Sequence, residues 1–303
     1  MSIWGARNGL AALGLLFLIN AQGPRVVLAE GAVRMRLLGG RLIVVPVYLN
    51  DQGPFDFLLD TGTTSTILTP ELAARLGLRP VDRVTLITVG GSRDVPRALL
   101  HKLAVGQAVS ADVEVLVSGL EQVRKLDPRV HGVLGQNFFE RFNYTLDYDR
   151  RTVEFRGVGG APPSGERVPF DVDEGKLIVG TSSGSASPRA LRLVLDAAAT
   201  DLVIFDDPGG SIALSLPARS AGLLLTEAGS GEARLARLRS LRVGDSRLED
   251  VPVALLPKPT GRGARAEDGL LPTSLFSAIY FDHGDRYVIF NPKPAGSSLR
   301  GRR

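Results

Sequence analysis

Residues 55–68 read FDFLLDTGTTSTIL, a stretch in which a short apolar run, FLL, leads directly into Asp60. A run this short and apolar is typical of a buried strand. Gly62 allows a tight turn and the close approach of another segment, and the hydroxyls of Thr61 and Thr63 stand beside the acid. A strand that ends on a carboxylate and turns on glycine can hold an acid at the floor of a cleft.

This pattern, two hydrophobic residues followed by Asp-Thr-Gly-Thr, resembles the strand that carries the catalytic aspartate in aspartic proteases, above all in their retropepsin-like branch. The resemblance implies that Asp60 is a catalytic carboxylate and that Gly62 and Thr63 shape and hydrogen-bond it. It also implies that the Thr61 hydroxyl locks two catalytic loops together, and that the substrate is a peptide or a protein.

The composition narrows the possible chemistry. The chain of 303 residues has no Cys and only three His, so it offers no thiol nucleophile, no disulfide and no Cys-ligated metal. The sequence contains no HExxH pair of the kind found in zinc hydrolases, and no GxSxG elbow stands where one would be expected in an α/β-hydrolase. Hydrophobic and charged contents of 44% and 22% are ordinary for a soluble globular protein. We expect no metal and no cofactor.

Residues 1–29 differ in kind from the rest of the chain. After Arg7, residues 10–19 form an apolar run too short to span a bilayer comfortably, and small residues suited to cleavage stand at Ala21 and Ala29. This pattern predicts a secretory signal peptide, with an uncleaved anchor as the alternative. The mature protein is then expected to be exported, either periplasmic or secreted, and to have no integral membrane span.

The net charge of +4 does not indicate a nucleic-acid partner. Two of the 36 basic residues lie in the predicted signal peptide, and three arginines lie in a basic tail, residues 292–303. The other 31 basic residues, one of which is Lys293 in the tail, are balanced by 32 acidic ones, so the sequence predicts no basic face on the body of the protein.

From Val33 onward, alternating hydrophobicity and turn residues predict strands rather than long helices. Residues 41–49 predict a strand, and residues 50–54 predict a tight turn after it. Residues 69–77 predict a short helix, because Thr69 can cap it, a proline occupies the first helical position and a glycine ends it.

A Gly-Gly turn in residues 85–95 predicts a hairpin. In the family that the chain resembles, a hairpin at this place closes over the substrate as a flap, which makes Val89, Gly90 and Gly91 flap candidates. An ordinary connecting hairpin is the alternative. By the same resemblance, the segment that contains Gly135 supports the catalytic loop from beneath.

A second set of similar landmarks comes after a Gly/Pro-rich linker at residues 157–165. Four landmarks recur in one order, about 136 residues later in the chain: Asp60 as Asp196, Gly106 as Gly244, Gly132 as Gly269 and Asp147 as Asp282. The recurrence predicts an internal duplication, with lobe one at residues 33–156 and lobe two at residues 166–291. By resemblance to single-chain, pepsin-like relatives, we expect a mostly β aspartic-protease fold, two β-rich lobes with short helices and a cleft between them.

The second copy has lost most of the motif. Alanines stand at residues 197–199 where the first copy has Thr-Gly-Thr, and Pro272 stands where the first copy has Gly135, but Asp196 remains. Two carboxyl groups a few ångströms apart cannot both ionise, so such a pair shares a proton and can activate water for peptide hydrolysis.

Three functions therefore stay open. The chain can be an active endopeptidase with an asymmetric Asp60/Asp196 pair, and hence a monomer. Two chains can instead join their first lobes into an Asp60/Asp60 pair, which requires a homodimer. The chain can also be an inactive, protease-like module that binds peptides. The alanines at residues 197–199 keep all three alternatives open.

Overall fold

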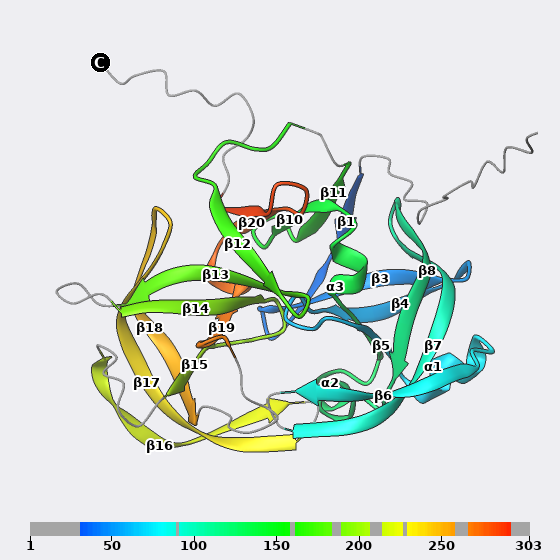
Figure 1. Cartoon of the computed structure of the whole chain (residues 1–303), viewed down its shortest axis with the longest axis horizontal. Helices are drawn as coiled ribbons and strands as arrows, with labels where there is room; N and C mark the ends of the chain where they lie inside the picture. Colours follow the sequence, from blue (N-terminus) through cyan, green and yellow to red (C-terminus); the bar gives the residue numbers. More distant parts are fainter. Residues whose placement is uncertain are drawn as a thin grey trace, which may run out of the picture.

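The computed structural model describes residues 31–88, 91–157, 161–183, 189–206, 214–226, 229–257 and 266–291. Strands dominate this part of the chain (Figure 1). The helices are short: α1 (Pro70–Arg75), α2 (Glu121–Leu126), α3 (Gln136–Phe139) and the 3-10 helix η2 (Thr273–Leu275). This architecture confirms the expected mostly β fold with short helices.

The first sheet gathers eight strands between residues 36 and 134. Near its centre, two parallel strands place Leu59 opposite Leu134, and the strand that follows the Asp60 turn pairs antiparallel with the second of them. In order across the sheet, the strands are β2 (Arg36–Leu38), β3 (Leu42–Leu49), β4 (Gln52–Leu59), β9 (Val130–Leu134), β5 (Thr66–Leu68), β8 (Ala108–Val117), β7 (Gly91–Val105) and β6 (Pro80–Thr88).

The second sheet has thirteen strands and joins segments far apart in the chain. Its order is β1 (Gly31–Arg34), β11 (Thr152–Arg156), β10 (Asn143–Asp147), β20 (Ala278–Asp282), β21 (Tyr287–Phe290), β12 (Val168–Asp173), β13 (Lys176–Ser183), β14 (Arg189–Asp196), β19 (Gly269–Pro272), β15 (Leu202–Asp206), β18 (Ser246–Pro257), β17 (Gly229–Val243) and β16 (Leu214–Thr226). The pairing of β14 and β15 with β19 has the same directions as that of β4 and β5 with β9.

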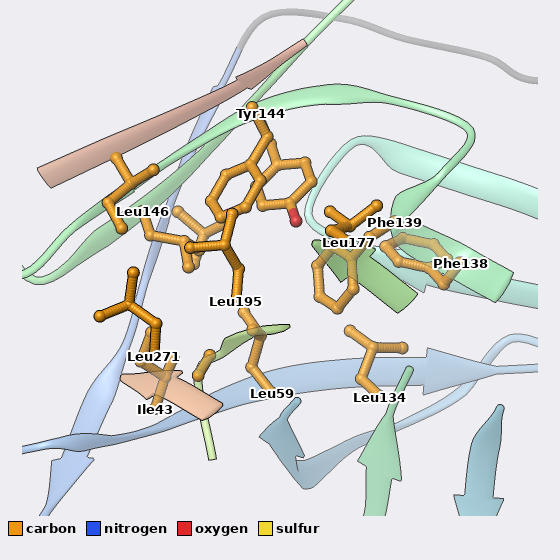
Figure 2. Close-up of a cluster of buried hydrophobic side chains, with 14 of the residues drawn as sticks. Ile43, Leu59, Leu134, Phe138, Phe139, Tyr144, Leu146, Leu177, Leu195 and Leu271 are labelled. Carbon is orange, nitrogen blue, oxygen red and sulfur yellow. The ribbon is translucent and has the colours of Figure 1, made fainter. Parts of the chain in front are cut away.

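The core places four leucines beneath the site. Leu59, Leu134, Leu195 and Leu271 are each fully buried in one hydrophobic cluster, and Figure 2 shows them close together. Each leucine is the last apolar residue before one of the four positions that the sequence singles out, two aspartates and two turn residues. Burying a leucine completely contributes about 1.5–3 kcal/mol. This packing fixes the ends of the four strands relative to one another.

The predicted helix after Thr69 is confirmed. Thr69 Oγ1 accepts a hydrogen bond from the Leu72 backbone N–H at 3.3 Å, proline occupies the first turn, and Gly77 follows the helix with a φ of +64°. Helix α2 has no such signal, because its N-cap is Leu120, which makes no capping hydrogen bond through its side chain. Sequence analysis therefore missed it.

The turn predicted at residues 50–54 is wrong in extent. Strand β4 already begins at Gln52, and the turn consists of Asn50 and Asp51, whose φ angles are +48° and +64°. Short polar side chains tolerate this left-handed conformation, and two residues in it suffice to connect twisted antiparallel strands. The glycine and the proline that suggested a longer turn are part of the strand.

Candidate active site

Asp60 lies at the end of β4, where the parallel neighbour β9 also ends. Its backbone N–H donates to Leu134 O at 3.0 Å, which continues the pairing of the two strands. Its side-chain Oδ1 accepts hydrogen bonds from the backbone N–H groups of Gly62 at 2.8 Å and Thr63 at 3.2 Å. The turn after the strand thus holds the half-buried carboxyl group in place. Residues 60–66 are called the Asp60 loop below.

Asp196 occupies a matching place at the end of β14. This strand runs parallel to β19 and pairs Asp196 with Pro272. The Asp196 Oδ1 accepts hydrogen bonds from the backbone N–H groups of Ala198 and Ala199, both at 2.8 Å. The three alanines therefore keep the backbone cradle, because it needs no particular side chain. Residues 196–201 are called the Asp196 loop below.

Thr61 joins the two loops through one hydroxyl group. Its Oγ1 donates to Leu195 O at 2.8 Å and accepts from the Ala197 N–H at 3.0 Å, and the side chain is fully buried. The sequence expectation that this hydroxyl locks the loops together matches this geometry. Ala197 has no hydroxyl to return the contact, so the hydroxyl link runs in one direction only.

The two carboxyl groups lie within hydrogen-bonding reach of each other. Burial raises the pKa of Asp60 well above its ordinary range, and the charge of Asp196 raises it further. Burial also raises the pKa of Asp196, against the N–H groups of Ala198 and Ala199, which lower it. Because both carboxyls resist ionisation, the pair is suited to hold one proton between them.

Gly62 permits this approach. A Cβ atom at Gly62 would lie 2.7 Å from both Cγ and Oδ2 of Asp196, well inside van der Waals contact. No rotation of a flexible side-chain end relieves this overlap, because the Asp196 carboxyl is held by the backbone. A glycine is needed here for space, since its φ is not in the left-handed region.

Gly135 packs against the Asp60 loop, which the family resemblance led us to expect it to support. A Cβ atom on Gly135 would meet the Ser65 carbonyl group at 2.5 Å, and the Gly135 N–H donates to Thr66 Oγ1 at 3.2 Å. The next residue, Gln136, adds two contacts to the same loop, from its N–H to Thr63 O at 2.9 Å and from Nε2 to Thr61 O at 3.1 Å. Sequence analysis missed Gln136, although a polar residue directly after the glycine was a usable signal.

Two predicted contributors are not brought to the carboxyl pair by a side-chain contact. Among the hydrogen bonds of the described residues, none joins the Thr63 hydroxyl to Asp60, so Thr63 contributes through its backbone. The flap candidates Val89 and Gly90 lie outside the described residues, and Gly91 is the first residue of β7. Below this tip, Leu86 and Val95 share a hydrophobic cluster with residues that pack against Ala198.

Two further findings concern metal-binding side chains and membrane-spanning helices. Within the described ranges, no three His, Asp or Glu side chains gather as they would around a metal ion. In the same part of the chain, no helix has the length and hydrophobicity needed to cross a bilayer.

Residues 45–138 match a family model described as aspartyl protease. Among solved structures, the chain is similar to a retropepsin-like aspartic protease from Rickettsia conorii. The identity is 21%, the alignment covers 45% of this chain and 94% of that chain, and the TM-score is 0.32. No match is found among curated proteins.

Proposed function

We propose that this chain, whose residues 45–138 match an aspartyl protease family model, is a retropepsin-like endopeptidase that uses Asp60 and Asp196 as one catalytic pair. The observation that carries the proposal is the contact between the two carboxyl groups, each held by two backbone N–H groups. A buried pair of acids costs folding free energy, and this cost is typical of functional sites.

The proposed reaction uses one shared proton. The ionised carboxylate takes a proton from a water molecule as the water attacks the carbonyl carbon of the peptide bond. The protonated carboxyl gives its proton to the carbonyl oxygen, which forms a tetrahedral intermediate. When this intermediate collapses, the pair recovers a proton from a hydroxyl and gives one to the departing nitrogen, and the carbon–nitrogen bond breaks. The pair ends with one proton, as it began.

The geometry favours a pair within one chain over a pair formed by two chains. Asp196 of the same chain already lies against Gly62, beside Asp60, in the place that a second Asp60 would need. Thr61 further ties the Asp60 loop to Leu195 O and the Ala197 N–H. These contacts support a monomeric enzyme, in which the two aspartates play unequal parts.

We further propose that the two halves arose by duplication and that the second half then lost its hydroxyls and glycine. The shared directions of the strand pairs, β4 and β5 with β9 and β14 and β15 with β19, support this origin. Loss of the threonines is tolerable because the Asp196 cradle is made by backbone. Export by a signal peptide at residues 1–29 is also a proposal, and it rests on the sequence pattern alone.

The test is cleavage of an unfolded protein by the purified chain, measured from pH 3 to pH 8, beside Asp60→Asn and Asp196→Asn. A single-chain pair requires that both variants lose activity by several orders of magnitude while still folding. Asp201→Asn is the matched control, because this half-exposed aspartate lies in the Asp196 loop and pairs with Arg41 instead. It should leave the pH profile unchanged.

Other outcomes would lead to the other functions. If only Asp60→Asn abolishes activity and the rate per chain rises with protein concentration, two chains form the pair. If the folded, unmutated chain cleaves no peptide bond at any pH, the endopeptidase proposal is refuted, and peptide binding without cleavage becomes the leading function.

A further inference from the structure

Tyr148 comes from the turn after β10, yet its side chain reaches the support of the Asp196 loop. Its hydroxyl lies 2.6 Å from Thr273 Oγ1, and its backbone N–H donates to Ser277 O at 2.8 Å. Thr273 is fully buried and directly follows Pro272, the residue that pairs with Asp196 across β19 and β14. One hydrogen bond and one strand pairing thus connect the tyrosine hydroxyl to the strand end that carries Asp196.

The tyrosine hydroxyl is also close enough to Asp196 to sense its charge. Burial raises the pKa of Tyr148 most, the Thr273 hydroxyl lowers it, and the charge of Asp196 raises it again. The side chain therefore stays protonated over the whole range in which a carboxyl pair titrates. A neutral hydroxyl bonded to Thr273 can hold the turn without placing a third charge beside the pair.

The support beneath the Asp60 loop is built differently. There the equivalent of Thr273 is Gln136, whose long side chain itself reaches up to Thr61 O at 3.1 Å. The tyrosine on that side, Tyr144, faces Gln136 without forming a well-shaped hydrogen bond. Figure 2 shows Tyr144 packed among the hydrophobic side chains beneath the site. Thr273 has a shorter side chain than Gln136, and its hydroxyl bonds the Tyr148 hydroxyl from the side instead.

The part of the Asp196 loop next to the carboxyl group has no polar side chain of its own to support it. Residues 197–199 are alanines, and this part of the loop is held by backbone hydrogen bonds and by the Thr61 hydroxyl from the other loop. Arg41 contacts the loop farther along, at Thr200 O and the Asp201 carboxyl. The start of the loop therefore has few side-chain interactions that fix its height above the core. A hydrogen bond to the fully buried Thr273 hydroxyl can fix it, since water does not reach this hydroxyl as an alternative partner.

We propose that Tyr148 is a positioning residue for Asp196, acting through Thr273 to hold the Asp196 carboxyl against Asp60. Its effect on catalysis rests on the proposed endopeptidase function, but its effect on the carboxyl pair can be measured without turnover. The substitution Tyr148→Phe removes one oxygen atom and keeps the ring, so the packing of the partly buried side chain against the core is preserved.

In the active enzyme, Tyr148→Phe should lower kcat about fivefold to twentyfold and leave KM within about twofold. This is the range expected when one buried hydrogen bond that orients a reacting group is lost. The pH profile should also narrow from both sides, because the two apparent pKa values of a coupled pair converge when its members move apart. Mere loss of folded protein would lower the rate equally at every pH.

Two comparisons isolate the bond. Tyr280→Phe is the matched control, since Tyr280 is also buried, lies on neighbouring β20 and hydrogen-bonds Asp282 and Asn143, in a separate cluster away from the site. It should leave kcat and the profile width unchanged. Thr273→Val removes the other partner of the bond and should reproduce the effect of Tyr148→Phe, and the double variant should be no worse than either single variant.

A titration that needs no substrate separates this proposal from the proposed function. In protein labelled with carbon-13 at the aspartate carboxyl groups, the signals of Asp60 and Asp196 report the two apparent pKa values of the pair. Tyr148→Phe should bring these values closer together, whether or not the protein cleaves peptides. If the separation stays the same as in the unmutated chain and in Tyr280→Phe, the positioning role is refuted, even if the enzyme is active. If the unmutated chain is inactive but the values converge, only the endopeptidase function fails.

Discussion

Replacing Thr61 by valine should test the link between the two loops most directly. Valine has nearly the same shape, so the substitution removes the hydroxyl and leaves the packing intact. The lost hydroxyl serves two backbone groups, Leu195 O at 2.8 Å and the Ala197 N–H at 3.0 Å. Both residues are buried, with exposed fractions of 0% and 1%, so water cannot replace the missing partner.

The magnitude comes from counting the orphaned groups. Leaving one buried donor or acceptor without a partner costs about 1–3 kcal/mol. Two such groups give an expected loss of about 2–6 kcal/mol in the free energy of unfolding, a large share of the 5–15 kcal/mol of a typical domain. Thr61→Ser keeps the hydroxyl and loses one methyl group, so it should cost only about 1 kcal/mol.

The free energy of unfolding can be measured by urea denaturation at pH 7, with far-ultraviolet circular dichroism as the signal. Thr63→Val is the matched control: this residue lies two positions from Thr61, is half-buried, and makes no side-chain hydrogen bond among the described residues. It should cost less than about 0.5 kcal/mol, as is usual for substitutions away from such features. A loss below about 1 kcal/mol for Thr61→Val, or equal losses for the two valine variants, would refute the proposed link.

Three further predictions concern the carboxyl pair and His283. Gly62→Ala should lower kcat at least about a hundredfold, because the new Cβ would lie 2.7 Å from the Asp196 carboxyl and displace it. Steady-state kinetics on the folded variant measure this loss. An unchanged kcat would contradict the prediction. Asp60→Asn should stabilise the protein at pH 7 but not at pH 3. The pKa of Asp60 is raised in the native state, so above the unfolded-state pKa the native carboxyl still holds a proton that the unfolded chain has released, and the stability of the unmutated protein falls as pH rises. A gain in the free energy of unfolding that did not grow with pH would contradict this prediction. Burial lowers the pKa of His283 to about 4 in the native state, so its ring is neutral in the fold while the unfolded chain binds a proton there below about pH 6.5. The free energy of unfolding therefore falls progressively from about pH 6.5 down to about pH 4. His283→Phe keeps the ring contacts with Tyr144 and should therefore remove up to about 3 kcal/mol of this acid loss, measured as urea unfolding at pH 7 and pH 4.

Features that depend on neighbouring residues could be predicted from the sequence. The strand that ends on Asp60, the backbone cradle around it and the helix capped by Thr69 all form between residues a few positions apart. Such elements are set by local hydrophobicity, turn chemistry and capping. The exceptions are informative: Leu120 begins a helix without a capping side chain, and a two-residue turn replaced the longer one expected after residue 49.

The carboxyl pair could be predicted from the sequence only in part. Its members could be named from the recurrence of landmarks in the chain, since the spacing pointed from Asp60 to Asp196. Whether their side chains meet could not be known, because this depends on how two parallel strand pairs pack through four buried leucines. The direction of the raised pKa values has the same origin, because burial and mutual approach cause it.

The sequence by itself therefore determined the protein class, the two aspartates and the degenerate second motif. Only the tertiary structure decided how the degenerate loop is held. Thr61 reaches across to Leu195 O, and Tyr148 reaches Thr273, in each case between residues more than a hundred positions apart. No local pattern encodes such contacts, because a hydrogen bond between distant segments depends on distances of a few ångströms that are set by packing of the whole core.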